Sequence, residues 1–288
     1  MQALRRSAAP SRIGSTYDRY DAGPSAPFLK WPGGKRWAGP SIGPLIRNRL
    51  RGIYFEPFLG GGAMYFYVRP DRAILADINR DLINVYRAVR DHFDELLDNL
   101  IRLPVSKKMY YQIRKSEPSN SMLRAVRFLY LNRTAFAGMY RLNQSGEFNV
   151  PYGGGQRGTE ILWRTAMLKQ ASSALQNAKL LHGDFETTIE QAGRGDVVYC
   201  DPTYTVTHDN NGFVRYNERN FSWADQERLV KAARRAKRRG ATVIVSNAHH
   251  REIRKIYGSA EFLTLTRPST LSVDPSNRRT IQEYLILL

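Results

Sequence analysis

Cysteine is almost absent from this chain of 288 residues, which contains Cys200 alone. A single cysteine excludes an internal disulfide and any cysteine-rich zinc site, and it is typical of a reducing compartment. The neighbouring histidines His249 and His250 have no carboxylate or second cysteine at ligand spacing. We therefore expect a cytoplasmic protein without a metal site, in which this histidine pair lies in a solvated or phosphate-facing loop.

Long hydrophobic runs are missing as well, and the apolar runs that exist have the length of a strand. Such runs are too short to cross a bilayer, and no amphipathic helix has a basic face large enough for a membrane surface. Residues 1–27 combine arginines with Ser, Ala, Gly and Pro and lack the hydrophobic core of a signal peptide. We expect no membrane partner and a basic, disordered tail over 1–27.

Acidic residues are scarce, with 26 Asp and Glu against 44 Lys and Arg, which gives a formal net charge of +18 at pH 7. An excess of this size suits a polyanionic partner, because binding to phosphates releases counterions. Nucleic acid is therefore the predicted partner. The basic run from Lys231 to Arg239 is not the predicted contact, because helical spacing spreads its charges around an outer, solvated helix.

Short apolar runs alternate with helical patterns from Gly52 onward, which is typical of an α/β protein with a doubly wound sheet. Strands are expected at 53–55, 73–76, 179–181, 196–200, 241–245, 262–266 and 280–288. Helical patterns fill most of the interval between the second and third of these strands, ending with one near 159–178. We expect a catalytic domain of parallel strands over 28–85 and 179–288, split by an inserted, mainly helical domain over 86–178.

The tetrapeptide Asp201-Pro202-Thr203-Tyr204 follows an apolar run and combines three groups suited to an exocyclic amine. The amino nitrogen of adenine or cytosine is a poor nucleophile, because its lone pair is delocalised into the ring. The Asp201 carboxylate and the Pro202 carbonyl can accept its two N–H protons, and the Tyr204 ring can stack on the base. The tetrapeptide alone is more typical of an ordinary turn after a strand.

Other blocks of the chain decide between these two interpretations. They are Phe-Leu-Lys-Trp-Pro-Gly-Gly-Lys at 28–35, Tyr-Phe-Glu-Pro-Phe-Leu-Gly-Gly-Gly-Ala at 54–63, Ile-Leu-Ala-Asp-Ile-Asn at 74–79, and the segments 128–133 and 146–153. With these blocks, residues 28–288 resemble the Dam-like family of DNA adenine methyltransferases. The family usually has a second proline in place of Thr203, which we interpret as a change in the rigidity of the turn.

The resemblance implies a Rossmann-like, S-adenosylmethionine-dependent methyltransferase fold with an inserted target-recognition domain. It also implies a monomeric bacterial or phage enzyme that methylates adenine in double-stranded DNA at a specific site. The implied donor-binding residues are Trp31, Lys35, Phe58, Gly60, Asp77, Asp184 and Asp201. Three of them, Asp77, Asp184 and Asp201, follow successive strands, at the edge where open α/β sheets place ligands.

Residues 132–153 interleave aromatic, amide and arginine side chains in a pattern that predicts a hairpin able to enter the major groove. By the resemblance, Arg141 reads a guanine, and the other candidate DNA contacts are Asn132, Asn143 and Tyr152. Ala137 and Met139 replace an amide and a leucine of the GATC-specific members. Despite these two replacements, the resemblance implies GATC or a related site as the recognition sequence.

Three other functions share parts of this pattern. A cytosine N4-methyltransferase would use the same amine chemistry, an RNA methyltransferase would fit the charge, and an inactive relative changed at Thr203 would still bind DNA. Carbon methylation of cytosine is not favoured, because those enzymes use a Pro-Cys pair and Cys200 precedes Asp-Pro here. Cys200 is instead expected to be a buried thiol in a strand.

Overall fold

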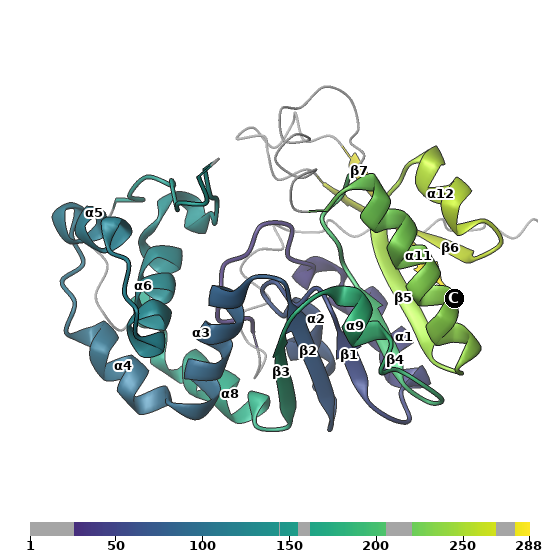
Figure 1. Ribbon diagram of the computed structural model, residues 1–288, viewed down its shortest axis with the longest axis horizontal. Helices are drawn as coiled ribbons and strands as arrows, with labels where there is room; N and C mark the ends of the chain where they lie inside the picture. The colour runs from purple at the N-terminus through teal and green to yellow at the C-terminus, as the bar shows by residue number, and fades with distance from the viewer. Residues whose placement is uncertain (1–25, 144, 155–161, 206–220, 269–279) are drawn as a thin grey trace, which may run out of the picture.

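The computed structural model describes residues 26–143, 145–154, 162–205, 221–268 and 280–288. At its centre lies a seven-stranded sheet in the order β3-β2-β1-β4-β5-β7-β6 (Figure 1). The strands are β1 (Tyr54–Glu56), β2 (Ala73–Asp77), β3 (Ala178–His182), β4 (Val197–Cys200), β5 (Thr242–Ala248), β6 (Glu261–Pro268) and β7 (Thr280–Leu287). Each lies within a few residues of its predicted position, whereas nearly all of the expected 1–27 tail falls outside the described residues.

Strands β1 to β5 pair in parallel, but β7 is antiparallel to both β5 and β6, so the sheet is mixed rather than built from parallel strands alone. The strand order reverses between β1 and β4, because β2 and β3 lie on one side and β4 and β5 on the other. This is the Rossmann-like, doubly wound arrangement, in which ligands bind outside the carboxyl ends of the strands at the reversal. Ala248, at the carboxyl end of β5, pairs with Glu283 of β7. The antiparallel strand therefore begins at this ligand-binding edge.

Helices cover both faces of the sheet, which explains the unbroken apolar run of β4. They are α1 (Gly39–Arg49), α2 (Ala63–Val68), α3 (Arg80–Asp91), α9 (Phe185–Ile189), α11 (Trp223–Arg238) and α12 (Arg251–Tyr257). Successive residues of a strand point to opposite faces. Val198 and Cys200 accordingly pack in the apolar layer with α9, α11 and α12, whereas Val197 and Tyr199 pack in the layer with α1, α2 and α3.

A helical region lies between β2 and β3, and in Figure 1 its helices α4, α5 and α6 stand to one side of the sheet, beyond β3. Its elements after α3 are α4 (Phe93–Ile101), α5 (Lys107–Lys115), α6 (Ser121–Thr134), η2 (Phe136–Gly138) and α8 (Thr165–Leu175). Asparagine and serine side chains cap α3, α5 and α6 by accepting backbone N–H groups of the first turn. Helix α3 contacts β2 and β3 as well as α6 and α8, so it packs with both parts of the molecule.

The basic run from Lys231 lies on α11, on the outside of the sheet as predicted (Figure 1). Arg235 forms ion pairs with Glu186 and Glu190, which lie in α9 and directly after it. Arg234 donates hydrogen bonds to the last carbonyl groups of α12. Part of the positive charge of α11 therefore binds the neighbouring helices α9 and α12. Across the described ranges, no helix is long and apolar enough to cross a membrane.

Candidate active site

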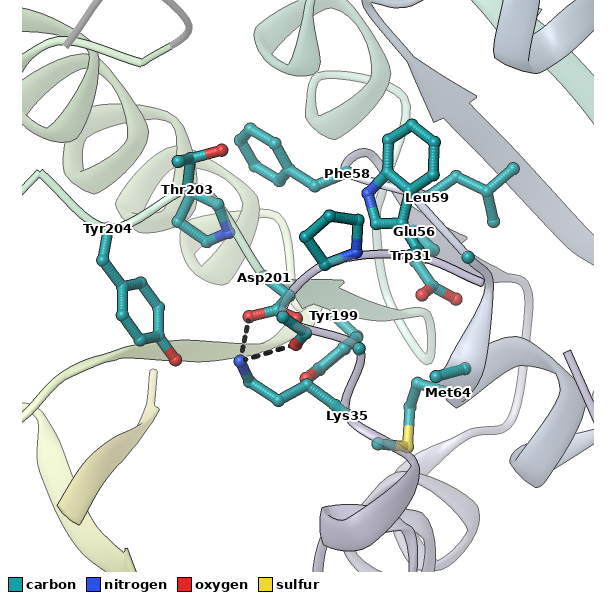
Figure 2. A pocket seen from close by; sticks show the side chains of 17 residues that line it. Trp31, Lys35, Glu56, Phe58, Leu59, Met64, Tyr199, Asp201, Thr203 and Tyr204 are labelled. Atoms are coloured by element: carbon teal, nitrogen blue, oxygen red, sulfur yellow. Dashed lines mark hydrogen bonds and ion pairs between the residues drawn. The ribbon is translucent and has the colours of Figure 1, made fainter. Parts of the chain in front are cut away.

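A cavity lies at the carboxyl edge of the sheet, between the ends of β1 and β4 where the strand order reverses (Figure 2). Seven residues predicted for catalysis or donor binding line it together: Trp31, Lys35, Phe58, Gly60, Asp201, Pro202 and Tyr204. They come from three segments that are far apart in the sequence, so the fold brings them to one place. Thr203 also lines the cavity, but its exposed side chain points away from Lys35 (Figure 2).

Lys35 is the centre of the charge network in this cavity. Its Nζ lies 3.1 Å from Asp201 Oδ1 and 3.2 Å from Glu283 Oε2, and the lysine side chain is only 7% exposed. Burial lowers the pKa of Lys35, but the two carboxylates more than offset this effect, so its pKa is raised above the ordinary value. Lys35 is thus a permanent cation. Its Nζ also lies 4.8 Å from the centroid of the Tyr204 ring, in a cation–π contact.

The pKa of the Asp201 carboxylate is raised above its ordinary value, although Asp201 lies beside a lysine. Burial raises its pKa to about 6, Lys35 acts in the opposite direction, and the charge of Glu283 raises it further. The group is therefore ionised at neutral pH yet protonates far more readily than an exposed aspartate. A carboxylate of this kind can accept a hydrogen bond from an amine and can also hold a proton.

Glu56, at the end of β1, is a second acidic group of the cavity, and our sequence interpretation did not select it. Its Oε2 accepts hydrogen bonds from Tyr54 Oη at 2.8 Å and from the Tyr65 backbone N–H at 3.0 Å. Burial raises its pKa to about 8, although the hydrogen bond from Tyr54 lowers it. Its position at the end of a buried strand, within the block 54–63, was a signal that could have identified it.

Asp77 shapes the glycine turn after β1. Its Oδ2 accepts the N–H of Gly60 at 2.9 Å, and its Oδ1 accepts the N–H of Asn79 at 2.9 Å. Gly60 has φ +48, and an added Cβ there would lie 2.8 Å from Cδ1 and Nε1 of Trp31. Only glycine fits both the backbone conformation and the close approach of the indole.

Trp31 joins this turn to the helical region. Its ring stacks on Tyr140 with centroids 5.1 Å apart and lies nearly parallel to the Phe128 ring with centroids 6.4 Å apart. The residue before it, Lys30, is held by Asn132, whose amide accepts from the Lys30 N–H at 3.0 Å and donates to the Lys30 carbonyl at 2.7 Å. Asn132 is fully buried, so the structure does not favour its predicted role as a DNA contact, and its amide instead fixes the backbone of the segment 28–35.

Asp184 lies beyond β3, at the predicted edge of the sheet, but it does not line this cavity. Its Oδ1 accepts the backbone N–H of Glu186 at 2.9 Å and caps α9. The same oxygen lies 2.8 Å from Nη2 of Arg228. The next residue, Phe185, stacks on the cavity residue Phe58 with ring centroids 5.1 Å apart. Asp184 therefore lies next to a residue that packs against the cavity wall.

The segment from Ala135 to Tyr152 forms the predicted hairpin. Its antiparallel bridges pair Ala135 with Tyr152 and Leu142 with Phe148. Arg141 is exposed, and its Nε donates to Asn149 Oδ1 at 2.9 Å. The amide of Asn143 instead shapes the turn by accepting two backbone N–H groups. Tyr152 is half-buried against Tyr110.

Two further residues near this hairpin were not selected from the sequence. Phe136 is 54% exposed, although large apolar side chains are usually buried. Arg133 is only 5% exposed. Within the part of the chain that the structure describes, its Nε and Nη2 have no hydrogen-bond partner. Burial, with a smaller effect from Arg164, lowers the pKa of this guanidinium to about 10.

Cys200 is buried in β4, as predicted, and burial raises the pKa of its thiol well above the ordinary value. His250 caps α12 through Nδ1, and the His249 ring packs 4.2 Å from the Tyr284 ring. Within the described ranges, no three His, Cys, Asp or Glu side chains lie together as a metal-binding group would.

Comparison with known proteins assigns the chain to a family. The model of the D12 class N6 adenine-specific DNA methyltransferases matches residues 31–271. The chain is 33% identical over 270 residues to the type II methyltransferase M1.LlaDCHI of Lactococcus lactis, an alignment that covers 90% of this chain and 94% of that protein. It is 35% identical over 246 residues to the type II methyltransferase M.MjaIII of Methanocaldococcus jannaschii, covering 78% and 84%. It is also 32% identical over 267 residues to the DNA adenine methylase of Escherichia coli, covering 90% and 94%. The chain belongs to the D12 class of N6 adenine-specific DNA methyltransferases.

Proposed function

We propose that this enzyme methylates a flipped-out adenine in double-stranded DNA, at GATC or a related site, with the donor and the target base meeting in the cavity at the strand reversal. The observation that carries the proposal is the convergence of the segment from Trp31 to Lys35 with Asp201, Pro202 and Tyr204 around one space (Figure 2). A base can reach this space only after it has left the duplex stack.

The cavity fits S-adenosylmethionine, which supplies an activated methyl group on a sulfonium cation. The ionised Asp201 carboxylate and the rings of Trp31 and Phe58 line the space, and both kinds of group favour a cation. The Glu56 carboxyl also lines it, and a bound cation would favour its ionised form although burial raises its pKa to about 8. Glu56 would face the amino end of the donor. Asp77 would hold the ribose while keeping Gly60 in its turn, and Asp184 would lie toward the adenine end.

Asp201 and Pro202 would prepare the target amine. The Asp201 carboxylate and the Pro202 carbonyl accept its two N–H protons, which localises the lone pair on nitrogen. Tyr204 stacks on the base, and its hydroxyl is anchored on Glu283 at 2.7 Å. The nitrogen gains a methyl group and loses one proton, which the Asp201 carboxylate would receive before it passes to solvent.

The helical region 86–178 would hold the DNA. Arg141 is exposed on the hairpin and would read a guanine edge, with Asn143 and Tyr152 supporting the hairpin. The exposed Phe136 would fill the gap that the flipped base leaves. The buried guanidinium of Arg133 would receive a DNA phosphate, because an uncompensated buried charge is costly and a phosphate would neutralise it.

Expression of the chain in a methylation-free host, followed by nucleoside analysis and sequencing of the modified DNA, tests the function. We expect N6-methyladenine within one short sequence. Asp201→Ala should reduce the rate at least about a hundredfold, the loss expected when one preorganised electrostatic partner is removed. Asp98→Ala, at an exposed position on α4, is the matched control. N4-methylcytosine, preference for structured RNA, or donor binding without transfer would each contradict the proposal.

A further inference from the structure

Glu283 of β7 is buried, with 3% exposure, and three donors surround its carboxylate. Tyr204 Oη donates to Oε2 at 2.7 Å, and Lys35 Nζ lies 3.2 Å from the same oxygen. Arg267 Nε lies 3.2 Å from Oε1. A buried carboxylate is costly unless it is paired in this way. Glu283 therefore connects the aromatic ring and the lysine of the cavity to each other.

We propose that Glu283 is a positioning residue for methyl transfer, which holds the Tyr204 ring and, through Lys35, the Asp201 carboxylate in the arrangement that receives the target base. The inference rests on the proposed roles of Asp201 and Tyr204. It adds a residue that comes from a distant antiparallel strand and does not itself touch the base.

The charges of the cluster support this role. Lys35 and Arg267 carry two positive charges, and Asp201 and Glu283 carry two negative charges, so the group is neutral as a whole. Lys35 divides its interactions almost equally, at 3.1 Å from Asp201 and 3.2 Å from Glu283. Without the charge of Glu283, Lys35 would pair with Asp201 alone, and the Asp201 carboxylate would be less available to an amine.

The Tyr204 ring depends on the same carboxylate. Its hydroxyl is fixed on Glu283, and its face lies 4.8 Å from Lys35 Nζ. A stacking ring helps most when its position is set before the base arrives, because ordering it later lowers the rate. Loss of this one hydrogen bond should therefore reduce turnover by about two- to tenfold.

The pH profile separates positioning from a purely structural role. The titratable groups that face Asp201 are Lys35, Glu283, Glu56, Tyr199, Cys200 and Tyr204. Among these, Glu283 raises the pKa of Asp201 and Lys35 lowers it. Glu283→Gln should therefore move the acid limb of kcat/KM to lower pH by at least about half a unit, whereas Lys35→Met should move it to higher pH.

The experiment uses the full chain, DNA from a methylation-free host and labelled S-adenosylmethionine between pH 5 and pH 9. Glu283→Gln should lower kcat about tenfold with a donor KM within about twofold of wild type, and should shift the acid limb downward. Glu261→Gln, at an exposed position on β6, is the control and should match wild type. Tyr204→Phe keeps the ring and removes only the hydroxyl, so it tests the contact even where a Glu283 variant fails to fold.

A Glu283→Gln enzyme with wild-type kcat and an unmoved acid limb would overturn the inference, as would a Tyr204→Phe enzyme with wild-type kcat. Asp201→Ala, measured in parallel, separates this result from failure of the proposed function. If Asp201→Ala is inactive while Glu283→Gln behaves as wild type, only the role of Glu283 is lost. An active Asp201→Ala enzyme would instead remove the proposed active site.

Discussion

Acidification should inactivate this enzyme near pH 6, well above the range in which an ordinary aspartate titrates. The reason is Asp201, whose pKa is raised to about 6 by burial, against the opposing effect of Lys35. A protonated carboxyl cannot accept the proton of the target amine. In the proposed mechanism, activity requires the ionised form, so it should fall as the pH decreases through 6.

The magnitude follows from the titration of a single group. At pH 5, about one molecule in eleven would have Asp201 ionised, so kcat/KM should be about tenfold below its plateau. With the ordinary value of 3.8, the same change of pH would leave the carboxylate almost fully ionised. Glu56, with a pKa of about 8, titrates in a separate range, and its effect should appear as a change in donor binding.

Measurement of kcat/KM for DNA at saturating donor between pH 4 and pH 9, with a melting temperature at each pH, checks this prediction. The native pKa of Asp201 lies above its ordinary value of 3.8, so the folded state binds the proton more tightly. This group therefore stabilises the fold as the pH falls from 6 toward 4, and its titration cannot cause loss of activity by unfolding. An acid limb near pH 4, or a flat profile between pH 7 and pH 5, would refute the assignment.

Three substitutions test other parts of the site. Thr203→Pro should keep or raise kcat, because the exposed side chain points away from Lys35; complete loss of turnover would show that the hydroxyl takes part. Arg141→Ala should weaken binding to cognate DNA by about 1 to 3 kcal/mol and leave the affinity for scrambled duplexes nearly unchanged, when both are measured over a series of salt concentrations. An equal loss of affinity for both duplexes would indicate a phosphate contact. Gly60→Ala should weaken donor binding in calorimetry at least about tenfold, because φ +48 and the 2.8 Å approach to the indole both oppose a side chain. Gly193→Ala, which has no atom within 4 Å of the added Cβ, is its control, and equal donor affinity in the two variants would contradict the packing argument.

The strands and the main cavity residues were predictable because their signals are local. A buried run such as 197–200 requires apolar residues on both faces, and the parallel arrangement carries the side chain that follows it, Asp201, to a common edge. Gly60 was likewise predictable from its position in a turn after a strand, because its φ of +48 is a conformation that favours glycine.

The missed residues depend on pairing between distant segments. Nothing near Glu283 in the sequence indicates that β7 runs antiparallel beside β5, yet this direction alone brings its carboxylate to Lys35. Asn132 illustrates the opposite error. Its neighbourhood of aromatic and basic residues suggested a DNA contact, but burial and the two hydrogen bonds to Lys30 are set by a contact across 102 residues.

Net charge and burial answer different questions about DNA binding. The net charge of +18 favours a polyanionic partner but does not identify the side chains that contact the partner. Arginines such as Arg235 already form ion pairs with carboxylates in or next to neighbouring helices. Arg133 differs, because its guanidinium is buried and two of its nitrogens have no partner among the described residues. Such a charge is costly until an anion arrives, and in the proposed complex a DNA phosphate would supply the charge that the protein does not. The cost of burying Arg133 without a partner therefore favours a phosphate at this position, beside the hairpin that carries Arg141.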